Sequence, residues 1–223
     1  MNDIYMSAAL GSAVLRPYVI GDHGGAVLSR WPAPGEPMPN HFEVLGLKPQ
    51  ICIDEAATDA KVKALIRQLH PDRYLRDGPA MVERAQKHTA LLNDAWRVLR
   101  DFEKRCQYVV DLAGERPDET YKPSAAELAL SFERNETLDE LAEAPQQNRR
   151  ALQSLLGELE GDRVDIREIL REDAELWDAA GGDPAGEATA RRKLRTSLGR
   201  LTYLDKLRSR CKELLEKTVP ERG

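Results

Sequence analysis

The residues of this chain best suited to chemistry are His70 and Asp72, which flank Pro71 in the stretch RQLHPDRY at 67–74. An imidazole and a carboxylate this close together could act as an acid–base pair. A catalytic site commonly adds a nucleophile, a glycine-rich phosphate loop or a set of metal ligands to such a pair. The sequence shows none of these features near His70 and Asp72. The pair therefore favours recognition over catalysis, and we expect a protein that is not an enzyme.

The segment before His70 predicts an amphipathic helix that ends at the proline. Its apolar residues follow the i, i+3, i+4, i+7 spacing of one helix face: Val62, Leu65, Ile66 and Leu69. Pro71 has no backbone N–H and disfavours helical geometry at His70, so the helix should end about there.

A second row of this helix carries Lys63, Arg67 and His70 at i, i+4, i+7, and the row should be exposed. Asp72 lies just past the helix end, where it could pair with Arg67, with Arg73 or with an arginine of a partner. The plainest interpretation is a solvated basic face with an accidental His-Pro-Asp stop. The alternative is a docking loop, and the neighbouring elements are needed to decide between the two.

Four helices are predicted between residues 40 and 114. The stretch NHFEVLGL suggests a short helix with Asn40 as its N-cap, and Asp54 should cap the helix that ends near Leu69. A polar loop separates it from a long helix over about 79–99, and a fourth helix covers about 102–113. Residues 1–39 include four prolines in WPAPGEPMP and are expected to be an irregular extension.

After a linker at 115–123, three long amphipathic segments fill residues 124–219. The first begins with a capping-box pattern at Ser124 and Glu127. Its predicted buried positions are Leu130, Leu138 and Leu141. The second segment continues its apolar phase past Gly161, which predicts a kink rather than a break. Three such helices joined by short turns should close into an antiparallel bundle, so we expect an all-α fold of two domains.

Composition narrows the function classes. The 223 residues carry a net charge of −5, which argues against a nucleic-acid binder. Three separated cysteines form no CxxC pair, so we expect no zinc site, no cofactor and a reducing, cytoplasmic location. The apolar run near the N-terminus lacks preceding basic residues and is too short to span a bilayer, so we expect no membrane association.

The order of these pieces resembles a J-domain: a short helix, a helix with a basic face, HPD, a loop, a long helix with NDAWRVL, and EKRCQYV. The resemblance implies that the HPD and the basic face dock on a DnaK-type chaperone ATPase and stimulate its ATP hydrolysis. It assigns chaperone binding to six residues: Lys63, Arg67, His70, Pro71, Asp72 and Arg73.

The second half is similar to the HscB (Jac) co-chaperones of iron–sulfur cluster assembly. The stretches SAAELALSFERNETLDEL at 124–141 and RLTYLDKLRSRCKELLEK at 200–217 carry this similarity, together with HFEVLGL and QLHPDRY. It covers about residues 40–217 and implies an HscA-type ATPase and the scaffold protein IscU as partners of a monomer. The animal relatives' cysteine-rich zinc module has no counterpart here.

The first bundle helix has a row that begins apolar and ends acidic. Leu128, Phe132, Glu136 and Glu140 share it at i+4 spacing, flanked by Ala129 and Glu133. One interpretation puts all the leucines in the core. However, buried glutamates without partners are costly, so an exposed recognition patch is favoured. The family resemblance assigns these six residues and Tyr203 to client binding. Two rivals stay open: a J-protein with another client, and a self-associating helical scaffold.

Overall fold

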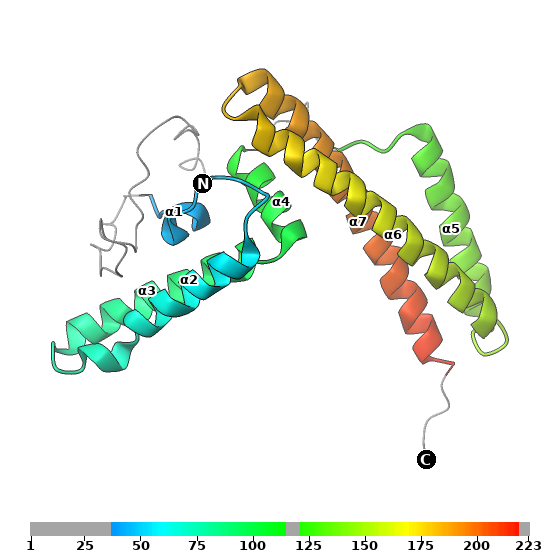
Figure 1. Ribbon diagram of the computed structural model, residues 1–223. Helices are drawn as coiled ribbons and strands as arrows, with labels where there is room; N and C mark the ends of the chain where they lie inside the picture. The colour runs from blue at the N-terminus through cyan, green and yellow to red at the C-terminus, as the bar shows by residue number, and fades with distance from the viewer. Residues whose placement is uncertain (1–36, 115–120, 219–223) are drawn as a thin grey trace, which may run out of the picture. The chain divides into compact units, whose positions relative to one another are not determined.

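The structure, a computed structural model, describes residues 37–114 and 121–218, and the secondary structure in these ranges consists of helices joined by loops (Figure 1). The all-α prediction is confirmed. The predicted irregular extension, apart from residues 37–39, and most of the predicted linker lie outside the described residues. No helix in the described ranges is long and apolar enough to cross a membrane. No group of three potential metal ligands was found in the same ranges.

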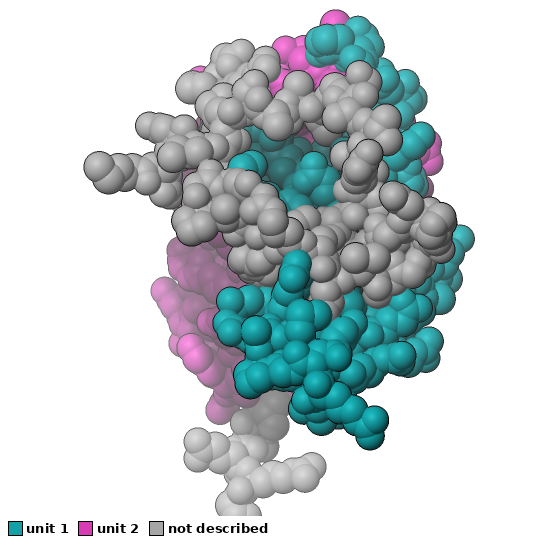
Figure 2. All heavy atoms as spheres, turned by 90° about the vertical axis from the view of Figure 1, so that its left-hand side faces the viewer, with its two compact units in different colours: residues 1–114, 177–184 teal, residues 115–176, 185–223 magenta. Residues whose placement is uncertain are grey.

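Two compact units make up the chain (Figure 2). The first takes residues 1–114 and 177–184, and the second takes residues 115–176 and 185–223. The first unit contains α1 (His41–Leu45), α2 (Glu55–Gln68), the 3₁₀ helix η1 (Pro71–Tyr74), α3 (Pro79–Leu99) and α4 (Phe102–Leu112). The second is built on α5 (Ala125–Glu143) and most of α6 (Arg149–Ala180) and α7 (Pro184–Glu216).

The helix starts predicted from capping residues are confirmed in the first unit. The Asn40 side chain accepts a hydrogen bond from Glu43 N, and the Glu43 carboxylate accepts one from Asn40 N, which completes a capping box. Asp54 caps α2 through Ala57 N. Gly78 precedes α3 with a φ of 96°, a left-handed value that only glycine adopts readily. The starts of α1 and α2 therefore follow from local side-chain chemistry, and the start of α3 follows a backbone conformation that favours glycine.

The core of the first unit is mostly apolar and encloses the charged side chain of Arg105. Arg105 is 2% exposed, and its guanidinium donates to three acceptors: Ile51 O, Leu99 O and Glu55 Oε1. A buried charge with this many partners recovers much of its desolvation cost. At the same loop, Asp178 accepts hydrogen bonds from Ile51 N at 2.8 Å and Cys52 N at 2.7 Å. The backbone at 51–52 is thus held by two charged side chains, Arg105 and Asp178.

The second unit packs α5, α6 and α7 around a leucine core. Its buried members are Leu138, Leu152, Leu155, Leu159, Leu204, Leu207, Cys211 and Leu214. Only one of them comes from α5, although that helix has 19 residues. The continuity of α6 through Gly161 is confirmed. The prediction that Leu130 is buried is wrong, because its side chain is 44% exposed.

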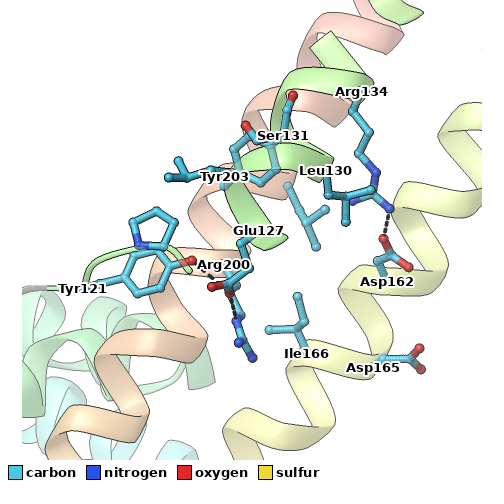
Figure 3. A pocket seen from close by; sticks show the side chains of 13 residues that line it. Tyr121, Glu127, Leu130, Ser131, Arg134, Asp162, Asp165, Ile166, Arg200 and Tyr203 are labelled. Carbon is cyan, nitrogen blue, oxygen red and sulfur yellow. Dashed lines mark hydrogen bonds and ion pairs between the residues drawn. The ribbon is translucent and has the colours of Figure 1, made fainter. Parts of the chain in front are cut away.

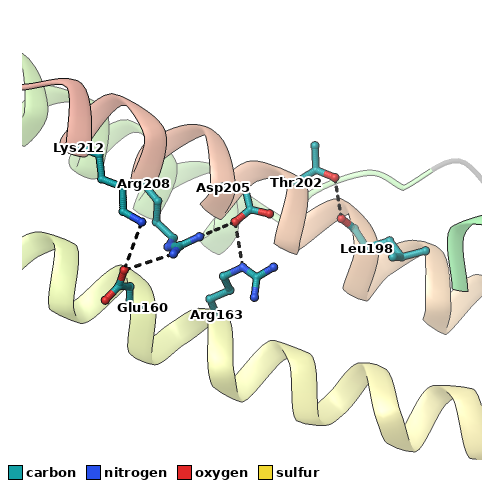
Figure 4. A network of polar contacts seen from close by, with 7 residues as sticks. All are labelled: Glu160, Arg163, Leu198, Thr202, Asp205, Arg208 and Lys212. Carbon is teal, nitrogen blue, oxygen red and sulfur yellow. Dashed lines mark hydrogen bonds and ion pairs between the residues drawn. The ribbon is translucent and has the colours of Figure 1, made fainter. Parts of the chain in front are cut away.

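Ion pairs fasten α6 to α7 (Figure 4). Asp205 accepts bonds from Arg163 Nε at 2.9 Å and Arg208 Nη1 at 2.8 Å. Glu160 lies 3.2 Å from Arg208 Nη2 and 3.6 Å from Lys212 Nζ. A network of this kind contributes more than an isolated surface pair, because each charge positions several partners.

Candidate functional site

The HPD loop lies at the end of α2, as its sequence predicts. The backbone leaves the helix at His70, with a ψ of 129°, and Pro71 begins η1. Thr89 of α3 donates to the carbonyl of Leu69 at 3.3 Å, and Leu69 is fully buried. The loop is therefore anchored by its preceding residue, while its polar side chains remain outside.

His70 and Asp72 contact each other in an exposed position. Their side chains are 55% and 76% exposed. The Nδ1 atom of His70 lies 3.4 Å from Asp72 N and 3.5 Å from Asp72 Oδ2. A neutral ring accepts from the N–H, whereas a protonated ring donates to the carboxylate. Of the three partners considered for Asp72 from the sequence, neither Arg67 nor Arg73 forms an ion pair with it in the described part of the chain, and an arginine of a partner stays a prediction. Within the described chain, the Asp72 carboxylate contacts the His70 ring instead.

The predicted basic row is exposed, but its charges differ in availability. Lys63 Nζ lies 2.6 Å from Asp59 Oδ2. The bond from Lys63 holds the pKa of Asp59 below its usual value, with a smaller contribution from the Trp96 indole N–H at 3.0 Å. No ion pair is recorded for Arg67 or Arg73 within the described ranges. These two arginines therefore present the less compensated positive charge beside the loop.

The predicted client residues on α5 are all exposed. Leu128 is 45% and Phe132 is 71% exposed, and Ala129 lies beside them. The acidic members are exposed too and have no ion pair recorded in the described chain: Glu133, Glu136 and Glu140. Exposed apolar side chains rimmed by carboxylates form a surface suited to a partner with apolar and basic groups.

Tyr203 occupies a different environment from Leu128 and Phe132. It is half-buried and packs against the leucine core of the second unit. Its hydroxyl donates to the carbonyl of Ser131 on α5 at 3.2 Å. Tyr203 and Leu128 both line one pocket, whereas Phe132 is not part of that lining. The structure therefore places Tyr203 and Leu128 at one pocket and gives Tyr203 a structural contact with α5 as well.

This pocket measures about 350 Å³ and opens between the N-terminal half of α5 and the facing parts of α6 and α7 (Figure 3). Its apolar lining includes Leu130, Ile166 and Leu204. Polar bridges stand at its edges: Arg200 Nε bonds Glu127 Oε1 at 2.5 Å, and Arg134 on α5 pairs with Asp162 on α6. These residues were not predicted as site residues from the sequence.

Glu127 connects the helix cap to the pocket. Its carboxylate accepts from Ser124 N at 2.7 Å and from Tyr121 Oη at 3.2 Å, besides Arg200. The bonds from Ser124, and then the Arg200 guanidinium, lower the pKa of Glu127 to about 2. The capping-box pattern predicted the bond to Ser124. Tyr121 also packs against Gly199 of α7, and that glycine, in the stretch SLGRL, is the sequence signal that could have pointed to the contact.

Comparisons with known proteins agree with this architecture, although no family model matches the sequence. The co-chaperone HscB homologue of Burkholderia multivorans is 33% identical over 151 residues, 67% of this chain and 83% of that protein. The homologue of Burkholderia cenocepacia is 32% identical over 152 residues, with the same two shares.

Two solved structures share the fold. The chaperone HscB from Vibrio cholerae has a TM-score of 0.55 at 22% identity, over 81% of this chain and all of that one. Human HscB has a TM-score of 0.58 at 20% identity, over 91% of both chains. The helices thus form a J-domain and a C-terminal bundle. With these curated relatives, the chain belongs to the HscB family of J-type co-chaperones, which serve iron–sulfur cluster assembly.

Proposed function

We propose that this protein docks through its J-domain on an HscA- or DnaK-type chaperone, stimulates ATP hydrolysis there, and delivers the scaffold protein IscU. Residues 40–114 would hold the chaperone site and residues 124–219 the client site, in a monomer that acts in the cytoplasm. The observation that carries the proposal is the exposed HPD loop, which the buried Leu69 anchors. Arg67 and Arg73, which have no ion pair in the described ranges, lie beside this loop in the sequence.

The docking step follows from charge. Arg67 and Arg73 would steer the loop onto an acidic surface of the chaperone. Asp72 would then make a charge-assisted bond to a partner arginine, because its carboxylate is 76% exposed and keeps lone pairs beyond the contact with His70. The J-domain supplies no catalytic group. It favours hydrolysis by binding the hydrolysis-competent state of the chaperone better than the other state.

The client step uses the row on α5. Leu128 and Phe132 would bury their exposed surface against IscU, and the three glutamates would select a basic surface around it. Large exposed side chains at the centre of an interface commonly dominate its affinity. The exposed part of the Tyr203 ring, at the pocket that Leu128 also lines, would add to the contact with IscU. The Tyr203 hydroxyl meanwhile bonds the Ser131 carbonyl and fixes the position of α5.

One experiment tests both steps. The ATPase rate of a purified HscA-type chaperone is measured with this protein, with IscU, and with both together. We expect stimulation by this protein alone and a larger effect with IscU present. An unchanged rate in the first mixture would overturn the docking step. Stimulation that IscU does not increase, combined with no binding in calorimetry, would assign the bundle to another client.

A double variant separates client contact from core packing. Leu128→Ala with Phe132→Ala should weaken IscU binding by at least about tenfold, while the melting temperature stays close to that of the unmodified protein. Val164→Ala is the matched control, because Val164 is 68% exposed on α6 and lies outside the row. Equal binding by the double variant and the control would refute the α5 row as the client surface.

A further inference from the structure

The pocket under α5 is open because polar bridges set the position of the helix. Two arginine–carboxylate pairs span it, Arg134 to Asp162 and Arg200 to Glu127, and the Tyr203 hydroxyl holds Ser131. The apolar contact of α5 with the core comes farther along, at Leu138. The N-terminal half of α5 therefore stands away from α6, and Leu130 faces an unfilled space.

Apolar side chains at the edge of the leucine core line this space. Leu130 is 44% exposed and Ile166 is half-buried, and both line the pocket with the buried Leu204. In a closely packed bundle these side chains would meet each other, since protein interiors leave few voids larger than a water molecule. A volume of about 350 Å³ is ample for one large apolar side chain from another molecule.

The charges at the rim do not cancel. Arg134 and Arg200 each have a carboxylate partner, whereas Asp165 is exposed and has no ion pair recorded in the described chain. The pocket thus carries three carboxylates against two guanidinium groups. The α5 row beside it adds Glu133, Glu136 and Glu140. An occupant with a lysine or arginine next to its apolar side chain is complementary to this rim.

The pocket is also continuous with the proposed client face, because Leu128 and Tyr203 belong to both. We propose that the pocket takes one apolar side chain of IscU, from a segment whose neighbouring lysine or arginine pairs with Asp165. This inference rests on the proposed function and extends it. IscU would then contact α5 at two places: the exposed row that contains Phe132, and the pocket that Leu130 lines.

The first test fills the pocket. Ile166→Trp places a large ring in the open space, and we expect IscU binding in calorimetry to weaken by at least about tenfold. Val164→Trp is the matched control on the same helix and should bind as the unmodified protein does. If Ile166→Trp binds IscU normally while Leu128→Ala with Phe132→Ala does not, the pocket inference fails and the proposed function stands. If the unmodified protein does not bind IscU, the proposed function itself fails.

The second test reverses the rim charge and does not disturb packing. Asp165→Lys should weaken IscU binding several-fold at low salt and less at high salt, since exposed charges are screened. Glu158→Lys, another exposed acidic residue of α6 that is not part of the pocket lining, should have a smaller effect. Equal effects of the two variants would overturn the pairing with Asp165. This test does not depend on Ile166→Trp, so it holds even if that variant does not fold.

The third test identifies the occupant. Leu130 is replaced with the photo-cross-linker p-benzoylphenylalanine, and the complex with IscU is irradiated. We expect a cross-link to an apolar residue of IscU that lies next to a lysine or arginine. A cross-link to a second copy of this chain, or to an IscU segment without a basic residue, would overturn the inference.

Discussion

The Tyr121 ring lies directly against Gly199 of α7, at a place where no side chain could fit. A β-carbon on Gly199 would lie 2.7 Å from Cγ and 2.8 Å from Cε1 of the tyrosine. From this position the Tyr121 hydroxyl bonds Glu127, which in turn pairs with Arg200. Gly199 therefore leaves room for Tyr121, in the segment before α5, to connect the start of α5 with α7.

Gly199→Ala should destabilise the second unit despite the better helix propensity of alanine. The propensity gain is roughly 0.5–1 kcal/mol, whereas overpacking typically costs about 1–3 kcal/mol. We expect a lower denaturant midpoint, measured by circular dichroism. Gly161→Ala is the control, because nothing lies within 4 Å of its added Cβ and that variant should be slightly stabilised. Adding Tyr121→Ala to Gly199→Ala should restore part of the loss; equal stabilisation by both glycine replacements would refute the contact.

His70→Gln and Asp72→Asn should each abolish stimulation of the chaperone ATPase and leave the melting temperature nearly unchanged. Exposed loop side chains contribute little to folding, so the loss would come from docking. Asp77→Asn, an exposed carboxyl in the following loop, is the matched control and should stimulate normally. Full stimulation by either HPD variant would contradict the docking site.

Charge reversal should affect Arg67 more than Lys63. The Lys63 charge is already paired with Asp59 at 2.6 Å, whereas Arg67 has no recorded ion pair among the described residues. Arg67→Glu should therefore weaken chaperone binding more strongly, and the difference should shrink at high salt as screening increases. Surface plasmon resonance at two salt concentrations measures both effects. Equal losses would show that the Asp59 pair opens on binding.

Glu127 makes the stability of the second unit depend on pH. Its folded-state pKa of about 2 lies below the ordinary value, so its stabilising contribution is complete above roughly pH 4.3. That contribution is lost as the pH falls toward about 2. Glu127→Gln should lower the melting temperature at neutral pH, and the difference from the unmodified protein should disappear near the lower limit. A difference that is constant with pH would contradict this assignment.

The three cysteines should react unequally with a thiol reagent. Cys52 is exposed, whereas Cys106 and Cys211 are buried. Burial raises the pKa of Cys106 to about 12 and raises the pKa of Cys211, so neither forms much of the reactive thiolate. Titration with dithionitrobenzoate at pH 8 should modify Cys52 quickly and the other two only after unfolding. Fast modification of Cys52→Ser would refute the burial.

The sequence by itself determined the elements and the HPD loop. Asn40, Asp54 and Ser124 each accept a hydrogen bond from a backbone N–H three residues away, and Pro71 ends a helix through its own ring. Because these interactions involve residues close together in the chain, the sequence alone predicts them. The apolar spacing also predicted correctly which side of α2 is buried. The exposure of Leu128 and Phe132 followed from the acidic residues that share their row.

Only the tertiary structure decided how α5 lies on its neighbours. Leu130 has the residue type of a core position, yet it borders an open pocket because Arg134 reaches Asp162 and Glu127 reaches Arg200. The two pairs join residues 28 and 73 positions apart, and Ile51 meets Asp178 across 127 positions. Periodicity reports which side of a helix is apolar. It does not report how closely that side approaches another helix, because the distance is set by side chains that meet only after the chain has folded.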